Sequence, residues 1–481
     1  MAEIIGRQEE TRRIQSLYNS TQSEFLAIYG RRRVGKTFLV TQYFKDKFAF
    51  RHTGLSPYED KAKITMKDQL QAFYYSLLRF GLDEGVPCPR DWQEAFFRLE
   101  RLLERKADGK KLVVFFDELP WMDTPRSKFV SAFEGFYNGW ATDRDDILLI
   151  VCGSNSSWIL KNIVGSKGGL YDRMTCEIKL VPFTLRETET YLQSRGIQMS
   201  RYDIVRVYLA LGGVPYYLSY LQRGMSVEQN IDEIFFREKA PLKSEFKRLF
   251  NTLFHNSGKY VDIVRALAKR NYGYTRDEIS EMTGISAGGG LSSYLEKLVE
   301  ADFIDQYTPV ASDGTQDYYR LKDCFCIFYL KYLYGKKELD EHFWRNSAGK
   351  PATQSWSGIA FEQVCLSHLE SIRRALGING IVTTASKLIV KGDGKKAGAQ
   401  IDMVIRRADG NVNLCEMKFC REEYSLDHNE HALLDGRVES LRQALKVKGT
   451  VFPTLVTTYG LKYNMYSGFF QNIMTLDDLF N

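Results

Sequence analysis

Residues 30–37 read Gly30-Arg31-Arg32-Arg33-Val34-Gly35-Lys36-Thr37 and fit the pattern G-x-x-x-x-G-K-[ST] at every fixed position. The stretch follows the apolar run Phe25–Tyr29, typical of a buried strand, and precedes a helical segment that starts at Phe38. A loop in that position points backbone N–H groups at phosphate oxygens, and the helix N-terminus adds partial positive charge. We expect Gly35 to let the backbone approach, Lys36 to reach the β- and γ-phosphates, and Thr37 to offer its hydroxyl to Mg²⁺. The stretch therefore predicts an α/β nucleotide-binding core with ATP and Mg²⁺ as cofactors; the alternative is an accidental glycine-rich turn.

Two later strands are predicted to end in polar residues. Leu112-Val-Val-Phe-Phe is followed by Asp117 and Glu118. Because parallel strands open into a ligand site at their carboxyl ends, we expect Asp117 to hold Mg²⁺ and Glu118 to polarise the attacking water. A solvated loop or a helix cap is the alternative. The run 146–155 ends similarly, and we expect Ser154 or Asn155 either to sense the γ-phosphate or only to cap the strand.

Arg173 closes the segment Gly169-Leu-Tyr-Asp-Arg. It is a candidate for stabilising transition-state charge, either within one chain or across a subunit contact in a homo-oligomer. A surface ion pair is the alternative. Further along, Leu211-Gly-Gly-Val-Pro is turn chemistry that interrupts a helical region and fits a helical lid.

Length and composition indicate the number of domains and the class of protein in which these motifs occur. A chain of 481 residues suggests about three domains, and 44% hydrophobic with 26% charged residues is typical of an ordinary soluble protein. No apolar run is long enough to cross a bilayer and the N-terminus lacks signal-peptide features, so we expect a cytoplasmic protein without a membrane partner. The eight cysteines are scattered, as in a reducing compartment, and a net charge of +6 is compatible with nucleic acid without requiring it.

Residues 256–322 predict a winged helix. A helix from Tyr260, a second helix capped by Thr275 and ended at Gly284, and a third from Gly290 are followed by a hairpin with a loop at Asp313-Gly314. The third helix of such a fold often enters the major groove, but here it carries no arginine cluster. Contact with DNA and a purely architectural role therefore both remain open.

Residues 323–355 are predicted as a helical linker. They begin with an aromatic-rich helix, Phe325-Cys-Ile-Phe-Tyr-Leu-Lys-Tyr-Leu-Tyr, more typical of packing than of a base-stacking platform. The stretch Ser347-Ala-Gly-Lys-Pro is small, polar and closed by proline, as expected of a connection.

Acidic residues recur in the last 126 residues, 356–481. Asp402 and Glu416 lie on two predicted strands joined by a turn at Asp409-Gly410, and this hairpin would bring the two carboxylates together. They would bind Mg²⁺, and Lys418, on the same strand face as Glu416, would orient water for attack on a phosphodiester. Glu362, next to a helix predicted at 363–376, would supply a third acid.

A zinc site is the rival interpretation of this region. Its ligands would be Cys415, Cys420, His428 and His431. Because Cys415 should face away from Cys420 if the strand persists, the four side chains are not expected to converge.

Two resemblances follow from these motifs. Residues 1–235 resemble the archaeal and bacterial P-loop ATPases of the STAND/AAA-like group, through the glycine-rich loop, the Asp117-Glu118 pair, Gly153-Ser154, the segment ending at Arg173 and the Gly-Gly-Val-Pro turn. This implies an α/β/α core with a helical lid. Residues 356–481 resemble the PD-(D/E)xK nuclease superfamily, although Ile401 stands where the proline of its name would be.

We therefore expect an α/β P-loop core at 1–180, a helical lid at 181–255, the winged helix, the helical linker, and a restriction-endonuclease-like α/β domain at 356–481. The preferred hypothesis is a Mg²⁺-dependent ATPase whose nucleotide state controls the winged helix and a nuclease-like domain acting on DNA. The alternatives are a nucleotide-controlled interaction switch with an inactive C-terminal domain and a chaperone-like remodeller.

Overall fold

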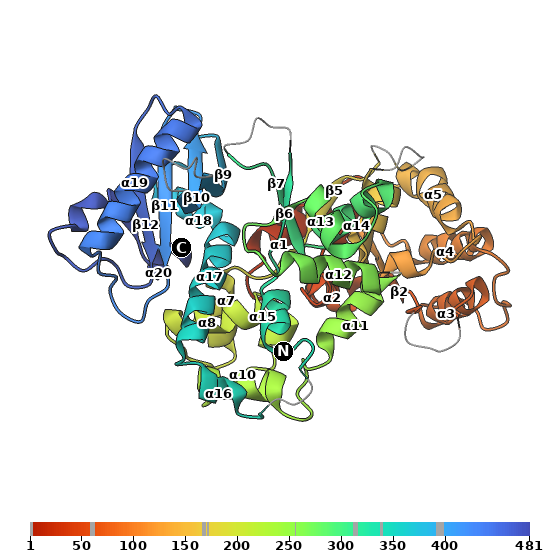
Figure 1. Ribbon diagram of the computed structural model, residues 1–481. Coiled ribbons are helices and arrows are strands. Elements are labelled where there is room, and N and C mark those ends of the chain that lie inside the picture. Colours follow the sequence, from red (N-terminus) through yellow and green to blue (C-terminus); the bar gives the residue numbers. More distant parts are fainter. Residues whose placement is uncertain are drawn as a thin grey trace. The chain divides into compact units, whose positions relative to one another are not determined.

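The computed structural model describes residues 3–57, 63–165, 170, 173–254, 256–310, 316–336, 340–390 and 399–481 (Figure 1). The chain forms two compact units. The first unit comprises residues 1–182, 249–255 and 300–302, and the second comprises 183–248, 256–299 and 303–481.

A parallel five-stranded sheet forms the centre of the first unit, in the order β2-β3-β4-β1-β5. Its three middle strands are almost wholly buried, which explains their near-continuous apolar sequence. The prediction of an α/β core with strands ending at the loop and at Asp117 is confirmed. The strands are β1 (Glu24–Tyr29), β2 (Phe48–Thr53), β3 (Leu112–Asp117), β4 (Ile147–Gly153) and β5 (Cys176–Lys179).

Helices cover both faces of this sheet. Alternate residues of β3 pack into two separate cores, Val114 and Phe116 on one face and Val113 and Phe115 on the other. The helices that contribute to the first core are α3 (Met66–Arg79), α4 (Trp92–Lys106) and α5 (Phe129–Gly139), and those of the second are α1 (Gln8–Tyr18) and α2 (Lys36–Phe44). Short α6 (Ser156–Ile159) follows β4, and residues 249–253 of α11 (Glu245–Leu253) also belong to this unit.

The second unit begins with lid helices around a glycine turn. A side chain at Gly213 is impossible, because its Cβ would lie 1.8 Å from the Phe183 carbonyl oxygen, and Tyr208 donates its hydroxyl to the same oxygen at 2.8 Å. Pro215 opens the next helix at its first turn, as the Gly-Gly-Val-Pro sequence predicts. The helices are α7 (Leu185–Ser194), α8 (Arg201–Leu211), α9 (Pro215–Leu218) and α10 (Val227–Ile231).

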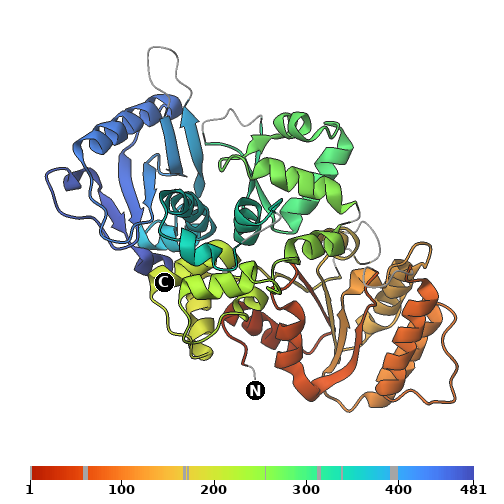
Figure 2. The ribbon, with the colours of Figure 1, turned by 60° about the horizontal axis from the view of Figure 1, so that its bottom comes forward.

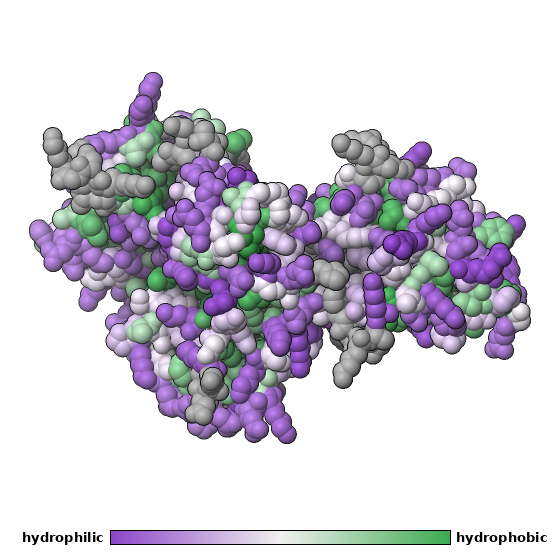
Figure 3. Space-filling view, turned by 45° about the vertical axis from the view of Figure 1, so that its right-hand side comes forward, coloured by the Kyte–Doolittle hydropathy of each residue, from purple (hydrophilic) through white to green (hydrophobic). Residues whose placement is uncertain are grey.

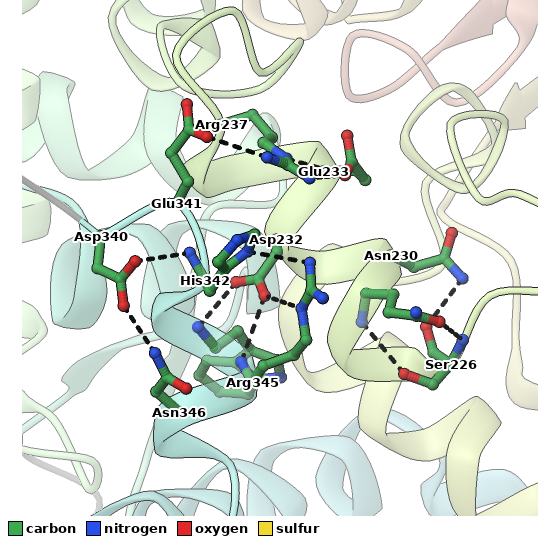
Figure 4. Close-up of polar contacts among 12 residues, drawn as sticks. Ser226, Asn230, Asp232, Glu233, Arg237, Asp340, Glu341, His342, Arg345 and Asn346 are labelled. Atoms are coloured by element: carbon green, nitrogen blue, oxygen red, sulfur yellow. Dashed lines mark hydrogen bonds and ion pairs between the residues drawn. The ribbon is translucent and has the colours of Figure 1, made fainter.

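Residues of the predicted linker pack on these lid helices. In α15 (Cys324–Tyr332), the ring of Phe325 lies 4.8 Å from that of Tyr217, so the aromatic run serves mainly packing. Asp232 is fully buried and accepts the backbone N–H of Trp344 at 2.8 Å and Nε of Arg345 at 3.0 Å, at the start of α16 (Phe343–Ser347; Figure 4). These contacts make the stretch part of the lid packing.

The predicted helices and hairpin of the winged helix are present. Thr275 caps the second helix in a capping box with Glu278, and Gly284 ends it with φ of 66°. Its elements are α12 (Ser257–Leu267), α13 (Arg276–Thr283), α14 (Gly289–Glu300), β6 (Tyr274–Thr275), β7 (Ile304–Tyr307) and β8 (Tyr318–Leu321). The predicted loop at Asp313-Gly314 lies outside the described residues.

A second five-stranded sheet forms the C-terminal part, in the order β13-β12-β11-β10-β9, with α19 packed along one face (Figure 2). Pairing is antiparallel among β9, β10 and β11 and parallel among β11, β12 and β13. The strands are β9 (Thr383–Val390), β10 (Ala399–Arg407), β11 (Val412–Lys418), β12 (Val451–Thr457) and β13 (Asn472–Met474), and the helices are α17 (Pro351–Ser367), α18 (Leu369–Ala375), α19 (His428–Leu445) and α20 (Leu476–Leu479).

The helix predicted at 363–376 was wrong in its bounds. Helix α17 already begins at Pro351, where proline suits the first helical position. The last residue of the connection predicted at 347–351 is therefore the first residue of this helix. It stops before His368, whose buried ring accepts the backbone N–H of Leu185 at 3.0 Å. His368 thus lies at the junction of α17 and α18 and makes this tertiary contact there.

Within the described ranges, no helix is long and apolar enough to cross a membrane. The face drawn in Figure 3 is largely hydrophilic, with hydrophobic residues in small patches between the polar ones.

Candidate functional site

The glycine-rich loop of the first unit joins the end of β1 to the start of α2. Gly30 has φ of 134°, and a Cβ there would lie 2.2 Å from the Leu180 carbonyl oxygen, so only glycine fits against the backbone segment that contains Leu180. Gly35 has φ of 96° with open space around it, which leaves room for a phosphate close to the backbone. Arg7 fixes the loop from behind, because its Nη2 donates to the carbonyl oxygens of Val181 at 2.6 Å and Val34 at 3.4 Å.

Lys36 lies buried beneath this loop. Its Nζ donates to the carbonyl oxygens of Gly30 at 2.9 Å and Arg31 at 3.0 Å, and to Ser154 Oγ at 3.2 Å. Burial lowers the pKa of Lys36, and the neighbouring Glu118 carboxylate partly offsets that effect. An anion at the loop would therefore gain a nearby cation that has few water contacts to lose.

Thr37 and Asp117 are brought together as the sequence predicts. The Thr37 hydroxyl donates to the Asp117 carboxylate at 3.0 Å, and Cys152 Sγ donates to Oδ1 of the same carboxylate at 2.8 Å. Burial raises the pKa of Asp117, which is 4% exposed. A hydroxyl and a carboxylate side by side are the hard oxygen donors that suit Mg²⁺ together with nucleotide phosphates, so the residues present fit this ion.

Glu118 and Ser154 also meet, at the ends of β3 and β4. Glu118 has a left-handed backbone, with φ of 48°, and accepts the Ser154 hydroxyl at 2.6 Å and its backbone N–H at 2.9 Å. Asn155 instead caps α6, with its side-chain oxygen accepting the Trp158 N–H at 3.2 Å. Ser154 therefore links Glu118 to Lys36, and Asn155 has a structural partner.

Arg173 is not brought to this cluster. Two residues after it, Thr175 donates its N–H to the carbonyl of Phe25, near the start of β1, whereas the glycine-rich loop leaves the end of β1 after Tyr29. Phe25 and Tyr29 are four residues apart along the strand, which corresponds to about 13 Å. A role for Arg173 within its own chain's site has no support from this position, and a role across a subunit contact stays a prediction.

The second cluster lies at the β10–β11 hairpin. Met403 pairs with Cys415, so Asp402 and Glu416 occupy neighbouring positions on adjoining strands. The pairing of β10 with β9 shifts register between Ile401 and Val404, and such an irregularity re-aims the side chain within it. Asp402 accepts the backbone N–H of Met417 at 3.0 Å.

Both carboxylates and Glu362 are buried. Burial, followed by the charges of Glu416 and Glu362, raises the pKa of Asp402 to about 7. Burial also raises the pKa of Glu362, against the opposing effect of Lys387. Asp402 and Glu416 offer two neighbouring carboxylates, the hard oxygen donors that suit Mg²⁺ or Mn²⁺ when water and substrate complete the coordination.

Three cations accompany these acids. Lys418 Nζ lies 3.1 Å from Glu416 Oε1, and Arg437 Nη1 donates to Glu416 Oε2 at 2.6 Å. Lys387 donates to Glu362, which also accepts from Asn271 at 3.2 Å. Burial alone lowers the pKa of Lys418, but the carboxylates of Glu416 and Glu430 raise it overall, so Lys418 is charged.

Sequence reasoning missed Lys387 and Arg437. Arg437 follows Glu430 and Leu434 at helical spacing, and Leu434 and Leu441 are both buried, so the inward face of α19 was a signal for it. Lys387 stands in β9 between Ser386 and the apolar residues Leu388–Val390, which is a weaker signal. Neither residue lies in a recognised sequence motif.

The zinc alternative finds no support in the described ranges. Nowhere in them do three or more His, Cys, Asp and Glu side chains form a group that could hold a metal ion. Cys415 is fully buried in β11, and the ring of His431 packs 5.2 Å from that of Tyr466. Mg²⁺ makes smaller demands on the protein, since one or two carboxylates with waters and substrate suffice.

Comparison with known proteins bears on the segment that contains the first of these clusters. Residues 4–221 match a family described as an ATPase domain predominantly from Archaea. This segment is an ATPase domain. The loop, Lys36, Thr37 and the Asp117-Glu118 pair all fall within the matched residues.

Relatives extend beyond the ATPase domain. An uncharacterized protein of Methanocaldococcus jannaschii is 24% identical over 406 residues, covering 83% of this chain and 84% of its own. The Walker-type ATPase of Pyrococcus abyssi is similar in structure at 19% identity with a TM-score of 0.48, covering 68% of this chain and 96% of its own. The Aeropyrum pernix ORC2 protein, in ADPNP-ADP complexes, has 14% identity and a TM-score of 0.43, with 76% and 96% covered.

Proposed function

We propose that the chain is a Mg²⁺-dependent ATPase whose nucleotide state controls a C-terminal domain that binds and cleaves DNA. The observation that supports the proposed nuclease activity is that Asp402, Glu416 and Lys418 lie together at one hairpin, next to buried Glu362. Two acids and a lysine in one buried cluster are suited to metal-assisted hydrolysis of a phosphodiester.

In the ATPase half, each described contact has a counterpart in hydrolysis. Lys36 would exchange its bonds to loop carbonyls and Ser154 for bonds to phosphate oxygens, and Thr37 and Asp117 would hold the ion. When bound, Mg²⁺ supplies positive charge to the phosphate oxygens. Glu118 would leave Ser154 and accept a hydrogen bond from the attacking water, so Ser154 connects the occupancy of the loop to the position of Glu118.

In the C-terminal half, Asp402 and Glu416 would hold the ion and Lys418 would orient water. Glu416 would then exchange its bond with Arg437 for a metal contact. The bound ion would polarise the phosphodiester. Arg437, once released, would be a donor for a phosphate oxygen.

The same contacts favour a second candidate function. Arg437 on Glu416 and Lys387 on Glu362 already satisfy two of the three acids, as in a domain that has given up metal for internal ion pairs. Under this alternative the C-terminal domain only binds DNA or protein, and the chain is a nucleotide-controlled interaction switch.

Incubation of the full chain with plasmid and labelled oligonucleotides, with and without Mg²⁺ or Mn²⁺ and ATP, separates the two. The proposal expects metal-dependent cleavage that Asp402→Asn abolishes and that responds to ATP in the wild type but not in Lys36→Ala. Binding without cleavage under every condition would establish the switch instead.

A further inference from the structure

A cleft of about 650 Å³ lies inside the second unit, between the winged helix, α15 and α17. Glu362 and Lys387, the ion pair of the C-terminal cluster, form part of its lining. One acid of the C-terminal cluster, Glu362, therefore borders the cleft, and what fits the cleft bears on the substrate of that cluster.

One wall of the cleft is apolar and aromatic. Ile359 and Tyr334 line it and remain 45% and 38% exposed, which is high for large apolar side chains. The guanidinium of Arg265 lies over one face of the Tyr334 ring at 4.9 Å and also pairs with Asp262 at 3.5 Å, so the other face of the ring is the one left for a ligand. Trp356, also in the lining, has a buried Nε1 without a hydrogen-bond partner in the described part of the chain.

The rest of the lining is cationic or amide. Lys269 and Lys331 are exposed in the cleft, and neither ammonium pairs with a side chain that the structure describes. Asn271, Gln363 and Gln400 add donors and acceptors. An apolar aromatic wall, amide groups and uncompensated lysines match the three parts of a nucleotide: the flat face of the base, its polar edge and its phosphates.

We propose that this cleft holds an unpaired nucleotide of a single-stranded nucleic acid and thereby makes single strands the substrate class of the C-terminal site. The base lies on Tyr334 and the apolar wall, and the flanking phosphates lie at Lys269 and Lys331. In a duplex each base is stacked on both faces, so it cannot enter such a cleft without being flipped out. The inference rests on the proposed action on nucleic acid.

The test measures binding apart from cleavage, with the full chain in EDTA and fluorescence anisotropy of a short labelled single strand and of its blunt duplex. We expect the single strand to bind about tenfold tighter or more. The Lys269→Ala, Lys331→Ala double variant should bind more weakly, with the slope of log K against log salt reduced by about 1.4 for two lost phosphate contacts. Tyr334→Ala should lose about fivefold or more, and Tyr334→Phe, which keeps the ring, should restore most of it.

Lys448→Ala is the matched control. Lys448 is an exposed lysine of the same compact unit, and it lies by the start of β12, where Thr450 bonds to Asn411, at the end of the sheet remote from Lys418. Equal affinity for single strand and duplex, or unchanged binding in both the double variant and Tyr334→Ala, would overturn the inference. If single strands bind, if these variants weaken that binding, and if no cleavage occurs when metal is added, the nuclease activity is contradicted. The assignment of the cleft to single strands is then still supported.

Discussion

Ser154 donates both its hydroxyl, at 2.6 Å, and its backbone N–H, at 2.9 Å, to the carboxylate of Glu118. The carboxylate is thus held by the strand next to its own, in reach of the hydroxyl that also contacts Lys36. If Glu118 polarises the attacking water, as we propose, it must exchange a hydrogen bond from Ser154 for one from that water.

Glu118→Gln tests that assignment. The amide is nearly the same size and can still accept from Ser154, so nucleotide binding should be retained, while loss of the charge should slow turnover by about 100-fold or more. Steady-state ATPase assays and a nucleotide-induced thermal shift measure the two effects separately. Wild-type turnover in this variant would remove Glu118 from the reaction.

Arg173 gives a prediction about assembly. Because it lies far from the loop of its own chain, any role in hydrolysis must be played at a neighbour's site. Arg173→Ala and Lys36→Ala should each be inactive alone and regain activity when mixed, since one subunit then supplies the intact loop and the other the arginine. A chain that stays monomeric with ATP, with specific activity independent of concentration, would rule this out.

Metal binding at the C-terminal cluster is tested by stability. In an Asp117→Asn background, which disables the ATPase metal site, Mn²⁺ at a hundredfold excess over its dissociation constant should add about 2.7 kcal/mol to the free energy of unfolding. Asp402→Asn should abolish the shift, whereas Lys418→Ala should keep most of it and stop cleavage. If Mn²⁺ shifts neither the background protein nor its Lys418→Ala derivative, the cluster holds no metal and the interaction switch takes precedence.

His52 makes a prediction about pH. It is 2% exposed, with Nδ1 2.9 Å from Ser76 Oγ, and burial, helped by nearby Arg79, lowers its pKa from 6.5 to about 3. The folded state keeps the ring neutral while the unfolded chain takes up a proton below pH 6.5, so this stabilisation is present above pH 6.5 and lost as pH falls towards 3. Between pH 7 and 5 the wild type should lose about 2 kcal/mol that His52→Gln does not lose. Urea unfolding at both pH values measures it, and parallel pH dependence of the two proteins would contradict it.

Much of the first site was predictable because its residues follow one another along short motifs. The loop, Asp117 and Ser154 each sit where a buried strand ends, and parallel strands bring those ends together whatever the rest of the chain does. The pairing of Asp402 with Glu416 was predictable for a similar reason, since a short hairpin fixes its own register.

What escaped prediction depends on contacts between distant segments. Lys387 meets Glu362 from another element, and Arg437 reaches Glu416 from a helix that begins ten residues after β11 ends. The break at His368 depends on an N–H of Leu185, and the place of Arg173 depends on how β5 pairs with β1. No local pattern encodes such partners.

Buried Asp232 has a mechanical consequence. Pulling α16 away from the lid would strip this carboxylate of a helix N-terminus and a guanidinium and leave a bare charge in the interior, which is costly. The lid helices and α16 should therefore move together as one rigid body. In the sequence, only residues 348–350 separate α16 from α17, and α17 carries Glu362. A displacement of these lid helices would therefore also displace α17 and Glu362 within the second unit.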